Sequence, residues 1–278
     1  MIEFVKETLQ LLPFLFATYL VLEAVEAHAG GALESFLERA RSVGPLAGAF
    51  AGAIPQCGVS AAAASFYAGG VISVGTLLAV FLSTSDELLP VLVSKQFPAS
   101  LLVKIVLVKA VAAIALGFTV NGVLAACRHL RRAVSVSELC AHSRCSCREH
   151  RGIVVPALIH TVEIFLFIVV VSGAVELCLH FFGEDSLNSL RLNAPFLGEL
   201  VAGAIGLVPN CAVSVAGAEL YAKGAMSAGA LMASSFTGSG LGLLVLFRTN
   251  RNLRENLFIL AVLYVVGVVF GWLAGFLF

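Results

Sequence analysis

The stretch Gly52-Ala-Ile-Pro-Gln-Cys-Gly-Val-Ser60 returns later in the chain as Gly206-Leu-Val-Pro-Asn-Cys-Ala-Val-Ser214. Each copy places a proline, an amide side chain and a cysteine inside small, apolar sequence. A shift of 154 positions aligns Pro55–Val93 with Pro209–Phe247 without a gap, and 17 of the 39 positions are identical. The chain is therefore an internal duplication.

The composition predicts a membrane protein. Hydrophobic residues make up 59% of the chain and charged residues only 12%, about half the share that is usual in a soluble domain. Several apolar runs are long enough to cross a bilayer, and Leu257–Phe278 contains no charge at all. These features favour an all-α polytopic protein in a lipid bilayer over a soluble protein with a large buried core.

A basic linker separates the two halves of the duplication. Between Cys127 and Gly152 there are six arginines and two acidic residues, so the positive-inside rule places this segment in the cytoplasm. The expected organisation is a first membrane half over residues 1–126, a Cys/His/Arg-rich cytoplasmic linker over 127–152, and a second membrane half over 153–278.

The loop charges also predict how the halves are oriented. The short loop Arg248–Arg254 is basic like the linker, so both are expected on the cytoplasmic side. The span after the linker then leads to the outside, so the second core must cross the membrane an odd number of times to return to the cytoplasm. Each half therefore has an odd total of crossings, and the two halves are antiparallel. An inverted repeat of five helical segments in each half, about ten in all, satisfies this condition.

Pro55 and Pro209 predict broken helices at matching places in the two halves. Proline donates no backbone hydrogen bond and clashes with the preceding turn. Irregular backbone at membrane depth persists where it is buried in protein or lines a wet cavity, and matched interruptions are typical of transporter binding sites. Simple proline kinks with small residues for close packing are the alternative.

Polar residues inside the apolar cores are the candidates for binding, because burying them without a role is costly. Asp86 and Glu87 stand where the second repeat has Gly240 and Leu241, so the predicted site is symmetric in backbone and asymmetric in charge. Either carboxylate would hold a cation, with amide, hydroxyl and backbone oxygens around it. The candidate substrate- or ion-binding residues are Pro55, Gln56, Cys57, Ser60, Ser83, Thr84, Ser85, Asp86, Glu87, His160, Glu163, Pro209, Asn210, Cys211, Ser214, Glu219, Thr237 and Ser239.

Some of these candidates have a plain structural alternative. Cys57 and Cys211, if brought together across a twofold axis, would add soft ligands, but a buried cysteine also packs as a small hydrophobe. His160 and Glu163 lie three residues apart on one helix face and are either an entry site or proton carriers, or a satisfied His–Glu pair.

The linker carries a second set of candidate ligands. Its thiols stay reduced in the cytoplasm, so a bound Zn²⁺ or another transition metal is favoured over disulfides, although the spacing matches no standard zinc finger. The alternative is a solvated basic loop. The candidate ligands are Cys140, His142, Cys145, Cys147 and His150.

Several of these motifs resemble a family of prokaryotic membrane proteins described as ten-helix heavy-metal exporters, also labelled arsenic efflux proteins or manganese transporters. The resemblance rests on Pro55–Ser60, the run Gly75–Glu87, His160-Thr161, Val208–Val215 and Glu219-Leu-Tyr221. It implies a multi-pass protein of the prokaryotic inner membrane that exports a metal ion or metalloid. Manganese suits carboxylate and carbonyl oxygen, whereas trivalent arsenic suits thiolates, and the sequence offers both.

The leading hypothesis is a secondary transporter that works by alternating access around a midplane site between the repeats, with H⁺ as the coupling ion. No Walker A motif is present, so ATP would have to come from a partner or not be used. The sequence offers no convincing catalytic dyad, so an enzyme is not expected. No required cofactor and no nucleic-acid partner is expected either. The sequence leaves open a homo-oligomer. The alternatives are a transporter of a small organic or sulfur-containing anion, a metal-sensing membrane receptor and, last, an intramembrane enzyme.

Overall fold

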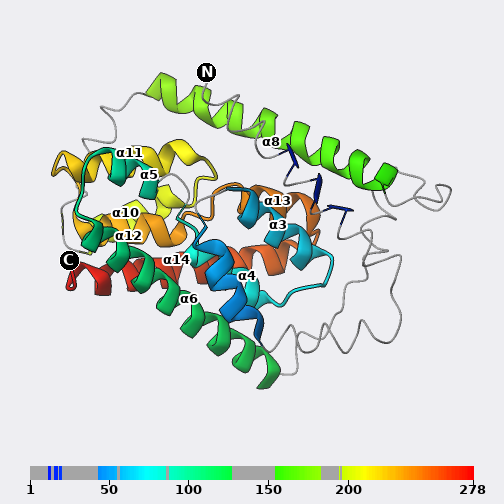
Figure 1. The fold of residues 1–278 in the computed structure, drawn as a ribbon, viewed down its shortest axis with the longest axis horizontal. Coiled ribbons are helices and arrows are strands. Elements are labelled where there is room, and N and C mark those ends of the chain that lie inside the picture. Colours follow the sequence, from blue (N-terminus) through cyan, green and yellow to red (C-terminus); the bar gives the residue numbers. More distant parts are fainter. Residues whose placement is uncertain are drawn as a thin grey trace.

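The regular structure of the chain is α-helical wherever it is described, as the composition predicted. The computed structural model describes residues 43–54, 57–85, 88–126, 154–182, 194 and 196–278, together with residues 12, 13, 16, 17, 19 and 20. Figure 1 shows the arrangement of the helices, with α8 along one edge and the long α6 along the opposite edge.

The helices of the first half are followed by those of the second half in the same order. The first half contains a helix at Val43–Gly52, α3 (Cys57–Ala68), α4 (Val74–Ser83), α5 (Leu88–Ser94) and α6 (Ala99–Ala126). After α8 (Val154–Phe182), the second half contains α10 (Leu197–Gly206), α11 (Cys211–Ala222), α12 (Ala228–Thr237), α13 (Gly242–Thr249) and α14 (Leu253–Gly275).

The helix bounds show that the duplication extends beyond the aligned stretches Pro55–Val93 and Pro209–Phe247. Each of the five first-half helices begins 154 residues before its second-half counterpart, from Val43 and Leu197 to Ala99 and Leu253. Even the helix caps correspond, because Ser73 accepts a hydrogen bond from the N–H of Thr76 and Ser227 accepts one from the N–H of Ala230. The same local signals therefore shape both halves.

Four helical stretches in the described residues are long and apolar enough to cross a membrane: Val74–Ser94, Ala99–Ala126, Ala228–Thr249 and Leu253–Gly275. The first and third are 75% and 72% buried, whereas the second and fourth are 28% and 33% buried. The broken stretches α4–α5 and α12–α13 thus form the centre of the protein. The continuous helices α6 and α14 leave most of their apolar residues exposed on the outside of the protein.

The two halves are interlocked through their short helices. Helix α3 of the first half packs on α13 of the second, and α5 of the first half packs on α11 of the second. Figure 1 shows the two pairs apart from each other, with the α3–α13 pair near α4 and the α5–α11 pair near α10 and α12. The centre is therefore enclosed by elements from both halves.

The interruptions in the helices are of two kinds. Helix α10 ends at Gly206 and α11 begins at Cys211, with Pro209 between them. The second kind interrupts the central stretches after Ser83 and after Thr237, and the residues of these breaks that the structure describes include no proline. Pro55 lies outside the described residues.

Candidate functional site

The C-terminal ends of α4 and α12 meet at one ammonium group, that of Lys109 on α6. Its Nζ donates a hydrogen bond to the carbonyl oxygen of Thr84, which caps the C-terminus of α4. It also donates to Ser235 on α12, to the carbonyl oxygen at 2.8 Å and to Oγ at 2.7 Å. The carbonyl of Ser235 is among the last four of α12, which a helix leaves without an intrahelical donor.

The Lys109 ammonium lies at two helix ends whose charge is opposite to its own. A helix C-terminus carries about −0.5 elementary charge, so two such ends contribute about −1, which the Lys109 ammonium offsets. The lysine is 1% exposed, and its Nζ lies 5.8 Å from the ring centroid of Phe236. An ionisable side chain buried at this depth is expensive unless it is paired in this way, and it marks a functional site in membrane proteins.

The break after α12 contains a buried hydroxyl that has no hydrogen-bond partner among the described residues. Ser239 is 1% exposed, and its Oγ makes no hydrogen bond within the described part of the chain. Gly240 beside it has φ +53°, a conformation that glycine adopts at little cost. Buried polar atoms are nearly always satisfied, so this oxygen is suited to accept or donate to a bound species.

The start of α3 lies against the same break. A Cβ built on Gly242, the first residue of α13, would lie 2.9 Å from the Cβ of Ser60 and 3.0 Å from its carbonyl oxygen. Ser60 is fully buried. The glycine therefore lets the Cys57–Ser60 turn of the first half reach the broken stretch of the second half. These are two of the segments that the sequence analysis assigned to one site.

Most of the other buried hydroxyls at the breaks donate to their own helix. Ser83 Oγ donates to the carbonyls of Ala79 and Val80, and Thr237 Oγ1 at the matching position donates to Ala233 and Ser234. Hydroxyl oxygens keep acceptor lone pairs when they donate, so these groups can still accept from or ligate a substrate. Two further hydroxyls of the first break, those of Thr84 and Ser85, donate to backbone carbonyls and are equally buried.

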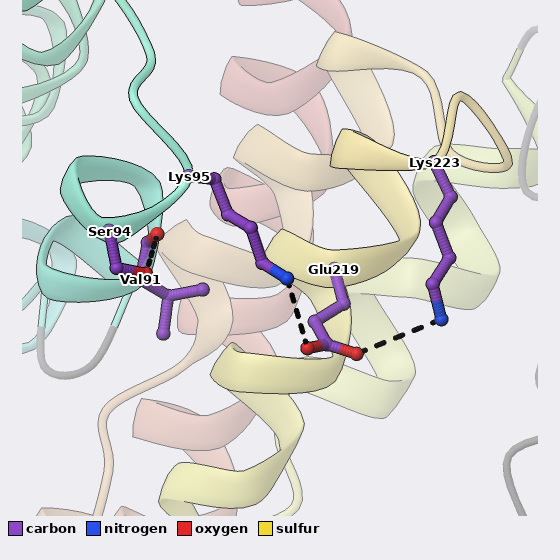
Figure 2. A network of polar contacts seen from close by, with 5 residues as sticks. All are labelled: Val91, Ser94, Lys95, Glu219 and Lys223. Carbon is purple, nitrogen blue, oxygen red and sulfur yellow. Dashed lines mark hydrogen bonds and ion pairs between the residues drawn. The ribbon is translucent and has the colours of Figure 1, made fainter.

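Two predicted carboxylates lie away from the breaks. Glu163 on α8 forms an ion pair with Arg248 at 2.5 Å, and both side chains are more than 40% exposed. Glu219 on α11 lies between Lys95 at 3.5 Å and Lys223 at 3.8 Å, as Figure 2 shows. Both acids are therefore engaged at half-exposed surfaces, where Glu219 links the end of α5 to α11.

We expect the Glu219 pair to contribute little to stability. Half-exposed ion pairs are worth about 0–1 kcal/mol, because water screens them and two flexible side chains must be ordered. A double-mutant cycle of Lys95→Met and Glu219→Gln, followed by thermal unfolding, should give a coupling free energy below about 1 kcal/mol. A coupling above about 2 kcal/mol would show that this pair fixes α5 to α11.

Several predicted site residues are not described, or only their backbone is. Among the described side chains, no three from His, Cys, Asp and Glu come together in a cluster suited to a metal. Pro209, Asn210 and Ser214 are half-buried around the start of α11. Outside the described residues lie Pro55, Gln56, Asp86, Glu87, Cys140, His142, Cys145, Cys147 and His150, and of Cys57, Cys211 and His160 only the backbone is described.

Neither Lys109 nor Glu199 was among the site residues predicted from the sequence. Two lysines, Lys104 and Lys109, lie in the mostly apolar run Ala99–Ala126, and they were the available signal, since charged residues inside a span usually have a function. Glu199 is 6% exposed on α10, and its Oε2 has no partner within the described residues. Its Oε1 approaches Gly229 in the first turn of α12, where a carboxylate complements the helix dipole.

A family model described as "Putative, 10TM heavy-metal exporter" matches residues 4–194, which is more than half of the chain. The chain belongs to this family. The resemblance found in the motifs is thereby confirmed. Membership in the heavy-metal exporter family agrees with the helices that are apolar enough to span a membrane and identifies a multi-pass membrane protein. No curated protein and no solved structure matches the chain.

The match to the exporter family ends at residue 194, before α10. It contains the first repeat, the linker and α8. The second repeat lies beyond the match, and there the internal duplication supplies the comparison, since α10 to α14 reproduce the helix bounds of the first half.

Proposed function

We propose that the protein is a secondary transporter that exports a heavy-metal ion or a metalloid through a site between its two repeats. One observation carries this proposal: the ends of the two broken central stretches, at Thr84 and Ser235, converge on a single buried group, Lys109. Transporter sites are formed where discontinuous helices expose backbone carbonyls and helix ends at the midplane. The unpartnered hydroxyl of Ser239 supports a ligand in the same region.

The halves are proposed to be inverted and to exchange access from one face of the membrane to the other. The α3–α13 pair and the α5–α11 pair are counterparts under the 154-residue shift, and each joins one half to the other. In an inverted repeat, these two pairs close opposite ends of the central site. Rocking of the halves would then open one pair while the other stays closed. Pro55 and Pro209 are proposed to keep the helices beside them broken.

The substrate follows from which ligands reach the breaks. Asp86 and Glu87 continue the chain directly after Thr84 and Ser85, so a divalent cation such as Mn²⁺ would be held by carboxylate and carbonyl oxygen. Cys57 and Cys211, the first residues of α3 and α11, would supply thiolates to trivalent arsenic. We favour the divalent cation, with H⁺ as the coupling ion, at the prokaryotic inner membrane.

A second candidate is a transporter of a small organic or sulfur-containing anion. The buried ammonium of Lys109 would favour it if a bound anion drew Nζ away from the carbonyls of Thr84 and Ser235, because a positive charge in a site attracts anions. The first turns of α3 and α11 would add free N–H groups. This candidate requires that the carboxylates at 86 and 87 be dispensable.

Flux into proteoliposomes tests the proposed function. Mn²⁺, Zn²⁺, Co²⁺ and arsenite are presented separately, with and without a pH gradient, to the wild-type protein and to the Cys57→Ser, Cys211→Ser double variant. Divalent flux that survives the loss of both cysteines supports the oxygen site, and arsenite flux that disappears with them supports the thiol site. If none of the four substrates moves, metal export is wrong and organic anions are tested next.

The linker is proposed to bind Zn²⁺ or a similar metal through Cys140, His142, Cys145, Cys147 and His150. Deleting residues 127–151 tests whether the protein transports a metal or only senses one. A transporter keeps its flux once the halves are joined by a neutral linker of equal length, whereas a receptor loses its function.

A further inference from the structure

The surroundings of the Lys109 ammonium have the composition of a cation site. The described acceptors at Nζ are two backbone carbonyl oxygens and one hydroxyl oxygen, from Thr84 and Ser235. Carbonyl oxygens at the C-terminal ends of broken helices are the groups that coordinate Na⁺ in transporters with this architecture. An ammonium is a compact point charge, so it can stand in such a position in place of an ion.

Electrostatics gives the same assignment. The ends of α4 and α12 both direct the negative ends of their dipoles at this position, and together they carry about −1 elementary charge. Both ends therefore stabilise a positive charge at this position. Without any cation the carbonyls of Thr84 and Ser235 would face each other across a buried, low-dielectric space, which is unfavourable.

We propose that Lys109 is a tethered cation, which permanently occupies a monovalent cation site formed by the C-terminal ends of α4 and α12. It joins the two broken stretches without a dissociable ion. Two consequences follow: the wild-type protein needs neither Na⁺ nor K⁺ to hold its centre together, and removal of the ammonium creates a protein that does need one of them.

The duplication supplies a matched control. The position equivalent to Lys109 on α14 is Leu263, which is fully buried. The residues equivalent to Thr84 and Ser235 are Gly238 and Phe81. The second half therefore has an apolar side chain where the first has an ammonium, and truncating Leu263 opens a buried space without leaving a cation site.

The test measures the thermal unfolding temperature of the purified full-length protein in NaCl, KCl or choline chloride at equal ionic strength. Four proteins are compared: wild type, Lys109→Ala, Lys109→Met and Leu263→Ala. Each is produced and purified in NaCl and then exchanged into the test salt. Choline screens surface charges as Na⁺ does, but the methyl groups on its nitrogen prevent carbonyl oxygens from coordinating it as they coordinate Na⁺.

We expect the wild type to unfold at the same temperature in all three salts. In choline chloride, Lys109→Ala should unfold at a temperature roughly 5–10 °C below that of the wild type, as expected for carbonyls left unsatisfied in a protein of this size. It should regain most of that loss as Na⁺ or K⁺ is added, with a saturable dependence on concentration. Lys109→Met fills the space with an apolar chain, so it should be destabilised in every salt without recovery.

The proposal is overturned if Lys109→Ala responds to Na⁺ and K⁺ no more than Lys109→Met or Leu263→Ala does, because the lysine would then be only a structural pin. It is also overturned if Lys109→Ala cannot be purified folded in either NaCl or KCl, since the ion should replace the missing charge.

The cation site itself is independent of the proposed function, and only its role in coupling depends on that function. If the wild type carries a metal substrate, its flux should be equal in Na⁺ and in choline, whereas flux by Lys109→Ala should require Na⁺ or K⁺. A wild type that moves none of the four substrates would contradict the proposed function and leave the unfolding test to decide on the tethered cation.

Discussion

Replacing Gly206 by alanine is expected to destabilise the protein by about 2–3 kcal/mol, the cost of overpacking a close contact between helices. Gly206 ends α10 where this helix crosses α12. A Cβ at this position would collide with Thr237 Oγ1 and with the carbonyl oxygen of Ser234, and would lie 2.9 Å from the Cα of Ser234. Since two of these atoms are backbone, the clash is relieved only if the helices separate.

The duplication predicts the same result in the first half. A Cβ on Gly52 would collide with Ser83 Oγ and lie 2.5 Å from the carbonyl oxygen of Val80. Gly52→Ala and Gly206→Ala should therefore have similar costs. Combining Gly206→Ala with Thr237→Ala should recover only part of the loss, because the contact with Ser234 remains.

Gly122 on α6 is the control for helix propensity. Nothing lies within 4 Å of a Cβ built at this position, so Gly122→Ala should raise stability by about 0.5–1 kcal/mol. Thermal unfolding in detergent measures all four variants. If Gly206→Ala and Gly122→Ala shift the unfolding temperature in the same direction, the close packing of α10 on α12 is wrong.

The sequence contained enough to predict the helical, membrane-spanning fold and the repeat. Apolar runs report bilayer crossings directly, and the 154-residue shift found between Pro55–Val93 and Pro209–Phe247 also relates the helices before and after that stretch. Helix α10 ends before Pro209 and α11 begins after it, and the statement that the proline causes this break stays a prediction. All of these signals are local.

The features of the site that could not be predicted from the sequence depend on contacts between segments far apart in the chain. Thr84, Lys109 and Ser235 come from three helices in two halves, and no spacing rule relates them. The same holds for Glu219, whose engagement by Lys95 depends on α5 packing on α11. A buried acid and a surface acid look alike in a sequence of this composition, so exposure could not be assigned to Glu163 or Glu219.

The largest functional effect is expected at Asp86. If the substrate is a divalent cation, Asp86→Asn should lower its flux by about 100-fold, which corresponds to about 2.7 kcal/mol at roughly 1.4 kcal/mol for each factor of ten. Proteoliposome flux of Mn²⁺ at subsaturating concentration measures the change. Glu163→Gln is the control, because its carboxylate is paired with Arg248 at a half-exposed surface, and its flux should stay within about twofold of wild type.

The size of this effect follows from the charges around the break. If Asp86 and Glu87 hold the cation as proposed, their two carboxylates supply a charge of about −2, which matches one divalent ion. Removing one carboxylate leaves an ion of +2 facing a site of −1, and the mismatch in a low-dielectric environment is costly. Arsenite is uncharged at neutral pH, so its flux should not depend on Asp86. If Asp86→Asn keeps its Mn²⁺ flux and carries arsenite as well as the wild type does, the site would be assigned to the cysteines.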